Sequence, residues 1–268
     1  MTEYTAATGA PVWFDLVSSD PLRAVDFYGE IFGWEAGDPH DEFGGYRNFS
    51  ANGRLVAGLM PRMSPSSPTD VWSVYFKVDD AAASVVSAQT AGATVLAPAS
   101  PVGDLGVMAV LADPAGGAFG LWQSGTHIGF TERGTHGTPY WFDEMSMDYA
   151  ASTEFYRSAF GWELNEIGSG GDPAAVGPDH YSEVYVGSGE DRQSVAGIMS
   201  AAGMFGSGAP SFWQVYITVD DVAGTVARVD ELGGEILMPG EVTPWGTLAS
   251  VKDPMGAAIC LGHPPAGM

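Results

Sequence analysis

One segment of the chain occurs twice, and this duplication constrains the fold more than any other feature. The first copy is PVWFDLVSSDPLRAVDFYGEIFGW over residues 11–34, and the second is PYWFDEMSMDYAASTEFYRSAFGW over residues 139–162. An internal repeat of this length predicts two copies of one structural plan. Eight residues match at a constant shift of 128 positions: Trp13, Phe14, Asp15, Phe27, Tyr28, Phe32, Gly33 and Trp34 recur as Trp141, Phe142, Asp143, Phe155, Tyr156, Phe160, Gly161 and Trp162.

The repeated segment predicts a strand followed by a helix. Residues 12–18, VWFDLVS, are rich in β-branched and aromatic side chains, which is typical of a strand. Asp20 and Pro21 then supply an N-cap and a proline for the first helical turn. Gly33 stands where a left-handed residue ends a helix, so we expect the helix to stop there.

Each half continues with a hairpin and a second strand-helix unit. Asn-Gly at residues 52–53 lies between two apolar runs and predicts a type I′ turn. The motif VDD precedes a second predicted helix at residues 78–80 and 219–221, and DPxG precedes a final strand at residues 113–116 and 253–256. The sequence therefore predicts an α+β fold with four βαβββ modules. These form two tandem domains with mixed curved sheets and open clefts.

The repeat also predicts the domain boundaries. We expect a first domain over residues 1–126, a linker rich in Gly and Thr over 127–137, and a second domain over 138–268. Whether modules pair within a half, between halves or between subunits stays open. The second half carries a Gly- and Pro-rich insertion at residues 167–181, which we interpret as a surface loop and a lid.

Composition excludes several classes of partner. The chain of 268 residues has 10 basic and 33 acidic side chains and a formal net charge of −23, which repels phosphate backbones and anionic lipids. We therefore expect no nucleic-acid or membrane partner. The single cysteine and the lack of a signal-like N-terminus predict a cytoplasmic protein. It is expected to be a monomer or a homodimer.

The motifs FYxxxFGW, VDD, DPxG and a final LWQ resemble the glyoxalase/bleomycin-resistance/extradiol-dioxygenase superfamily over nearly the whole chain. The tandem WFD openings are similar to two-domain proteins of actinobacterial type that are labelled hydroxylases. In metal-dependent members of the superfamily, the first and last strands of the modules supply the ligands. The resemblance places these ligand positions at Trp13, Ser73 and Gly120 in the first half and at Trp141, Gln214 and Cys260 in the second.

None of these six residues is a histidine or a carboxylate, so the resemblance predicts a metal-free protein with no cofactor. Strand alternation places Asp15 beside Trp13 and Asp143 beside Trp141. An aromatic cleft with a few polar groups is typical of a site for a flat organic ligand. The predicted ligand-binding residues are Trp13, Ser73, Tyr75, Trp122, Trp141, Gln214, Tyr216 and Cys260, and the candidate catalytic residues are Asp15 and Asp143.

Three functions fit this pattern. The first is metal-free binding of an aromatic or polyketide-like metabolite, for sequestration or presentation. The second is a cofactor-independent enzyme or hydroxylase accessory, with hydroxylase-like, isomerase-like or lyase-like chemistry at Asp15 or Asp143. The third is a non-catalytic scaffold whose tryptophans plug the clefts. Two residue-level alternatives also stay open: the aspartates could cap backbone groups at a helix start, and Cys260 is either a buried small side chain or a reactive thiol.

Overall fold

The computed structural model describes residues 3–64, 69–167, 177–206 and 208–263, and within them each half forms its own eight-stranded sheet. The first half contains β1 (Pro11–Ser18), α1 (Pro21–Phe32), β2 (Glu35–Ala36), β3 (Arg47–Ala51), β4 (Arg54–Pro61), β5 (Val71–Lys77), α2 (Ala81–Thr90), β6 (Thr94–Val102), β7 (Gly106–Ala112) and β8 (Ala118–Ser124). The second half contains β9 (Pro139–Ser146), α3 (Tyr149–Phe160), β10 (Glu163–Ile167), β11 (Gly177–Val186), β12 (Gln193–Ser200), β13 (Phe212–Thr218), α4 (Val222–Glu231), β14 (Glu235–Thr243), β15 (Gly246–Lys252) and β16 (Ala258–His263).

The two sheets have the same topology. The first runs β2-β3-β4-β1-β5-β8-β7-β6 and the second runs β10-β11-β12-β9-β13-β16-β15-β14. In each, the first strands of two modules pair antiparallel at the centre, and the last strand of each module lies parallel to its own first strand. The predicted α+β fold of βαβββ modules is confirmed, and modules pair within each half.

The predicted helix signals act as expected. The Asp20 side chain accepts a hydrogen bond from the Arg23 backbone N–H at 3.1 Å, which satisfies a free donor of the first turn. Gly33 ends α1 with a φ of 70°. Asn52 and Gly53 both have positive φ, 53° and 75°, as a type I′ turn requires.

The insertion in the second half is partly a strand rather than a loop. Residues 177–181, expected within a surface loop, belong to β11, which pairs with both β10 and β12. The prediction was wrong there because the segment pairs with β12 at Gly177 and Tyr181, and Tyr181 also pairs with Ile167 of β10. The rest of the expected lid, residues 168–176, lies outside the described residues.

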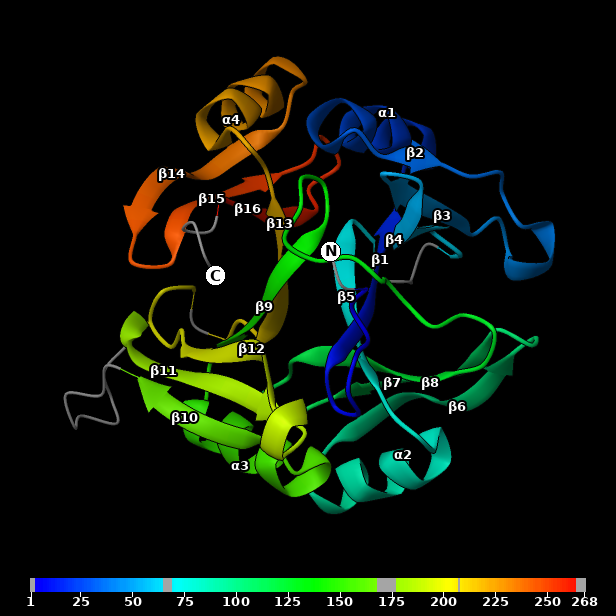
Figure 1. Cartoon of the computed structure of the whole chain (residues 1–268), viewed down its shortest axis with the longest axis vertical. Coiled ribbons are helices and arrows are strands. Elements are labelled where there is room, and N and C mark those ends of the chain that lie inside the picture. The colour runs from blue at the N-terminus through cyan, green and yellow to red at the C-terminus, as the bar shows by residue number, and fades with distance from the viewer. Residues whose placement is uncertain (1–2, 65–68, 168–176, 207, 264–268) are drawn as a thin grey trace.

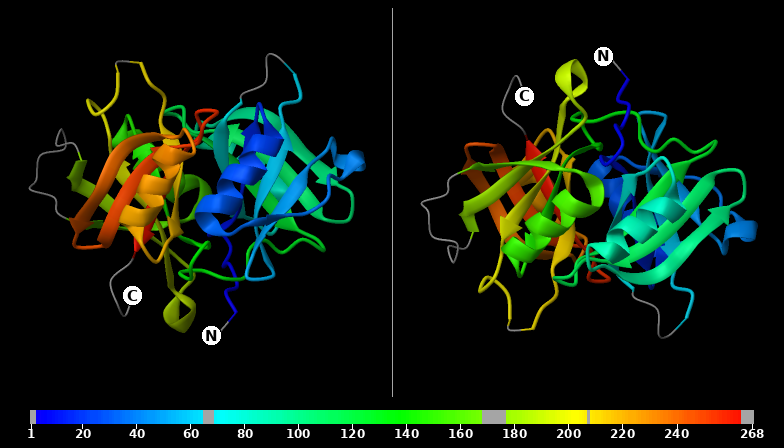
Figure 2. Two further views of the ribbon diagram at one scale, coloured as in Figure 1. Left: turned by 90° about the horizontal axis from the view of Figure 1, so that it is seen from above. Right: turned by 90° about the horizontal axis from the view of Figure 1, so that it is seen from below.

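The halves pack through their helix-bearing faces. Helix α1 lies beside α4 and helix α2 beside α3, at opposite ends of the molecule (Figures 1 and 2). Between them, Phe14 of β1 meets Phe142 of β9 with ring centroids 6.2 Å apart, and Phe76 of β5 meets Trp213 of β13 at 5.0 Å. The apolar core is therefore continuous across the two sheets.

The aromatic residues of the repeat also join the halves by hydrogen bonds. Trp34 donates from Nε1 to the Gly137 carbonyl at 2.6 Å, and Trp162 donates to the Gly9 carbonyl at 3.1 Å. In the same way Tyr28 donates to Asp253 and Tyr156 to Asp113, both at 3.0 Å. The FYxxxFGW motif of each half thus donates hydrogen bonds across the junction, and the DPxG aspartate of the opposite half accepts the one from the tyrosine. Both copies of the two motifs therefore have a structural role.

Each sheet is strongly curled. Strands β11 and β15 are five strand spacings apart, about 24 Å in a flat sheet. Yet the ring of Tyr181 in β11 lies 6.3 Å from the ring of Trp245, in the turn between β14 and β15. Phe43 similarly approaches the turn at Gly103 across the first sheet. The face that carries no helices is therefore concave in both sheets.

Among the described residues, no helix is long and apolar enough to cross a bilayer.

Candidate functional site

Strand alternation places the predicted residues of the first half on the concave face. Phe14 points into the core, so Trp13 and Asp15 point the other way. In the strand register Trp13 lies opposite Tyr75, which lies opposite Gly120, while Ser73 lies opposite Asp15. The strand register therefore places these residues on one face of the sheet, as expected.

A buried carboxyl group lies at the centre of this face. Asp15 is 7% exposed and accepts hydrogen bonds from the hydroxyls of Tyr75 at 3.3 Å and Tyr46 at 3.4 Å. Trp13 donates from Nε1 to the Tyr46 hydroxyl at 2.9 Å. We call Trp13, Asp15, Tyr46 and Tyr75 the first aromatic-acid cluster. Burial raises the pKa of Asp15 to about 7, against the opposing effect of the two tyrosine hydrogen bonds.

The second half repeats the arrangement with shorter contacts. Asp143 accepts from the Tyr181 hydroxyl at 2.8 Å and from Trp141 Nε1 at 2.9 Å, and Trp141 Nε1 also lies 2.8 Å from the Tyr181 hydroxyl. We call Trp141, Asp143, Tyr181 and Tyr216 the second aromatic-acid cluster. Burial raises the pKa of Asp143, and hydrogen bonds from Tyr181, Trp141 and Tyr216 oppose this.

Asp15 and Asp143 therefore accept hydrogen bonds from side chains, and neither caps the start of a helix. The N-caps of α1 and α3 are Asp20 and Asp148. The alternative that Asp15 and Asp143 cap backbone groups is wrong, because their recorded partners are tyrosine hydroxyls and indole N–H groups. Neither cluster contains a lysine or an arginine, so burial dominates the ionisation of both acids.

Tyr46 and Tyr181 were not predicted from the sequence. They fall outside the constant shifts of the repeat, because the segments before them differ in length. A usable signal lies on the neighbouring strand, where VAGLM at residues 56–60 recurs as VAGIM at 195–199. A Cβ atom on Gly58 would lie 1.7 Å from the Tyr46 hydroxyl, and one on Gly197 would lie 1.8 Å from the Tyr181 hydroxyl. The two glycines thus make room for the two tyrosines.

Cys260 and Gln214 lie beside the second cluster. Gln214 is opposite Asp143 in the register, and Cys260 is opposite Tyr216. The Cys260 thiol is 3.3 Å from Gln214 Oε1 and is 3% exposed. Burial raises the pKa of Cys260 to about 12, so the group is a neutral thiol near neutral pH. The reactive-thiol alternative is therefore not supported.

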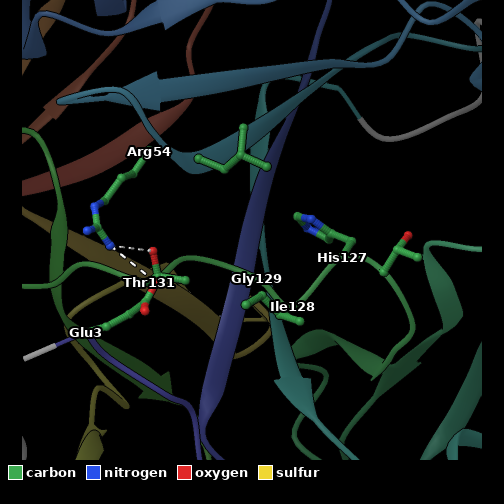
Figure 3. A pocket seen from close by; sticks show the side chains of 8 residues that line it. Glu3, Arg54, His127, Ile128, Gly129 and Thr131 are labelled. Carbon is green, nitrogen blue, oxygen red and sulfur yellow. Dashed lines mark hydrogen bonds and ion pairs between the residues drawn. The ribbon is translucent and has the colours of Figure 1, made fainter.

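The first cluster is covered by the segment that joins the halves. The ring of His127 meets Trp13 edge-on at 4.4 Å, and Trp122 donates from Nε1 to the His127 carbonyl at 2.9 Å. Burial lowers the pKa of His127 to about 4, so the ring is neutral. His127 also lines a surface cavity of about 370 Å³, together with Leu55 and with Arg54, which pairs with Glu3 (Figure 3). His127 was expected only as a linker residue.

Together these features define a class of protein. It has two tandem pairs of βαβββ modules, and each pair forms a curled sheet whose helix-free face holds the candidate site. The chain belongs to the glyoxalase/bleomycin resistance protein/dioxygenase superfamily. A model of that superfamily matches residues 145–261, and a glyoxalase-like domain model matches residues 12–122.

Relatives and solved structures agree with this assignment. The anthracycline biosynthesis protein DnrV of Streptomyces peucetius is 35% identical over 97% of each chain. An Mn(II)-bound glyoxalase from Novosphingobium aromaticivorans has a TM-score of 0.62 at 16% identity, covering 96% of this chain and 82% of that one. The 2,3-dioxygenase LapB of Pseudomonas sp. KL28 has a TM-score of 0.63 at 14% identity, covering 98% and 96%. At these identities the two solved structures show the fold alone.

The side chains at the six family ligand positions do not fit a transition metal. An indole N–H has no lone pair to give, Gly120 has no side chain, and the Cys260 thiol is held neutral by burial. Each cluster offers a single carboxyl group, which is already bonded to tyrosines. In the part of the chain that the structure describes, no three His, Cys, Asp or Glu side chains are grouped to hold a metal ion.

We therefore predict that the purified protein contains no stoichiometric transition metal. Elemental analysis by inductively coupled plasma mass spectrometry should find less than about one tenth of an equivalent of Zn, Fe, Ni or Mn per chain, because about three converging ligands are needed for a stable site. The control is the same protein dialysed against a chelator, which should keep its melting temperature. One reproducible equivalent of metal, lost together with ligand binding on chelation, would contradict the prediction.

Proposed function

We propose that the protein binds a small aromatic or polyketide-like metabolite on the concave faces of its sheets, without a metal ion, and sequesters or presents it. The observation that carries this proposal is the duplicated aromatic-acid cluster. In both halves an indole and two tyrosines surround one buried carboxyl group, and the indole stands at a position that the superfamily resemblance assigns to a metal ligand. Aromatic walls with a few fixed polar groups suit a flat organic ligand.

The relatives support the chemical class. DnrV and DauV, both named as anthracycline biosynthesis proteins, are each 35% identical to this chain over more than nine tenths of its length. A polycyclic aromatic ligand would gain from ring stacking against the indoles. The net charge of −23 favours a neutral ligand over an anionic one.

Truncation of the cluster tryptophans tests the proposal. If an aromatic ligand lies against Trp13 or Trp141, replacing either with alanine should weaken its binding about tenfold or more, since stacking and burial contribute on the order of 1 to 3 kcal/mol per indole. Binding is measured by quenching of the ligand's own fluorescence. If both tryptophans only plug the faces, the variants should lose stability and even the wild type should bind no ligand.

One observation favours an enzyme as a second candidate. A pKa near 7 leaves Asp15 part protonated at neutral pH, as a general acid-base group requires. With a substrate in hand, Asp15→Asn or Asp143→Asn should abolish turnover and preserve binding. Loss of binding and turnover together would instead indicate that the aspartates only hold the tyrosines in place.

A further inference from the structure

The two concave faces differ in how far the protein itself fills them. On the first face Trp13 is 4% exposed, and Tyr75 and Trp122 are each 7% exposed. On the second face the counterparts of Trp13 and Tyr75, which are Trp141 and Tyr216, remain partly exposed. The clusters are alike in composition, so this difference comes from what covers them.

The cover of the first face is fixed in place by backbone hydrogen bonds. His127 N–H donates to the Leu105 carbonyl at 3.1 Å, and Phe130 N–H donates to the Val12 carbonyl at 3.1 Å. Gly129 approaches Val12 so closely that a Cβ atom there would lie 2.1 Å from the Val12 carbonyl oxygen. The imidazole therefore stays against Trp13, and the Trp122 ring lies against the imidazole with ring centroids 5.5 Å apart.

On the second face the position of Trp122 is taken by Gly262. Lys77 pairs with Trp122 in the first sheet, and the equivalent Thr218 pairs with Gly262 in the second. The Tyr140 hydroxyl lies where a side chain at position 262 would be, since a Cβ atom on Gly262 would be 1.8 Å from it. The residue equivalent to Tyr140 in the first half is Val12, so this hydroxyl has no counterpart there.

The Tyr140 hydroxyl is a buried polar group with no hydrogen-bond partner among the described residues. Burial raises its pKa, and the neighbouring Cys260 and Asp143 raise it further, so the group stays a neutral donor. Buried polar groups in native proteins nearly always have a partner. An acceptor atom supplied by a ligand would complete this one.

An aromatic residue stands at the rim of the same face. Trp245, 40% exposed in the turn between β14 and β15, lies across the face from Tyr181, with 37° between the ring planes. At the same place in the first half stands Leu105, whose carbonyl holds His127. The second face thus offers an indole at its rim, a partly exposed Trp141 and an unpaired hydroxyl. On the first face Leu105 takes the place of Trp245, and Trp13 is covered.

We propose that ligand binds to the second face alone, and that it is a planar aromatic ketone or quinone whose carbonyl oxygen accepts a hydrogen bond from Tyr140. This rests on the proposed small-molecule function and narrows it to one site. The Trp245 ring covers one edge of the ligand and Trp141 lies against its plane. A neutral carbonyl suits the site better than a carboxylate, because the acidic surface of the protein disfavours an anionic ligand.

Equilibrium dialysis of the full chain against 1-hydroxyanthraquinone, read by its absorbance, tests this. We expect one molecule bound per chain, a loss of about tenfold in affinity for Trp245→Ala, and a loss of about fivefold for Tyr140→Phe. The ring analogue without carbonyl groups, 1-hydroxyanthracene, should bind the Tyr140→Phe variant as well as it binds the wild type. Tyr140→Phe should also melt no lower than the wild type, since it removes a hydroxyl without a partner.

The matched variants are Leu105→Ala, at the turn position equivalent to Trp245, and His127→Ala. Both should leave the affinity within about twofold. If Leu105→Ala or His127→Ala alters binding while Trp245→Ala and Tyr140→Phe do not, or if two molecules bind, the one-sided assignment is wrong and the proposed function stands. If the wild type binds neither compound, and no other aromatic ketone, the assignment fails together with the proposed function.

Discussion

Replacing Trp162 with alanine should lower the melting temperature by roughly 10 °C. Trp162 is 1% exposed, stacks on Tyr156 with ring centroids 4.5 Å apart, and donates to the Gly9 carbonyl of the other half. Removing a buried indole leaves a cavity and an unpaired carbonyl at the junction of the halves, which costs about 3–5 kcal/mol. Calorimetry measures the change.

The same argument holds for Trp34, which is 4% exposed and donates to Gly137. Trp245→Ala is the control, because its indole is 40% exposed and should be worth little to the fold. Equal shifts in melting temperature for Trp162→Ala and Trp245→Ala would contradict the inference that Trp34 and Trp162 hold the two halves together.

The contribution of Asp15 to the free energy of unfolding should fall as the pH rises from about 4 to above 7. Its folded pKa is about 7 and its unfolded value is near 3.8. The folded state therefore binds the proton more tightly than the unfolded state. The stability from this group is complete below the unfolded pKa and is lost as the pH rises through the folded pKa. The shift corresponds to something on the order of 4 kcal/mol.

Denaturant unfolding of the wild type and of Asp15→Asn between pH 4 and pH 8 measures this effect. The amide cannot ionise, so the variant should gain on the wild type steadily across the range. Asp230→Asn, on the exposed surface of α4, should differ from the wild type by a constant amount. Parallel curves for Asp15→Asn and the wild type would show that Asp15 does not carry the proton in the folded state.

Much of the fold could be predicted from the sequence because the same structural signals occur in both halves. The strand-helix opening, the Asp20 and Gly33 signals and the DPxG turns each appear in both halves, so an error in one half would conflict with the other. The insertion after β10 has no counterpart in the first half. There the Gly and Pro content predicted a loop, but residues 177–181 form a strand that pairs with β12, and with β10 at Tyr181.

The candidate site was predicted in part. Alternation within a strand placed Asp15 beside Trp13, since both lie in one uninterrupted element. Tyr46, Tyr181 and His127 come from segments whose length or course differs between the halves, so their approach to the clusters depends on tertiary structure. The sequence does show that Gly120 and Cys260, or Trp122 and Gly262, are unequal pairs. The consequence of that inequality for the two faces required the structure.

Glu144 shows the same limit inside the core. It is fully buried and accepts from Ser152 at 2.7 Å, while the same position of the first half is Leu16. Burial raises its pKa well above the usual value, and the neighbouring Asp113 raises it further. A single acid at an otherwise apolar repeat position gave no sign that its partner would come from the other half.

The central claim is that the concave faces bind an aromatic metabolite without a metal, and native mass spectrometry of the intact protein tests it most directly. After incubation with a panel of neutral aromatic polyketides, the wild type should retain an organic adduct at the mass of the chain plus ligand, with no mass increment for a metal. The Trp141→Ala variant should lose most of the adduct. If the whole panel leaves the wild type free of adduct and its melting temperature unchanged, or if the adduct forms only with a bound metal ion, the account is contradicted.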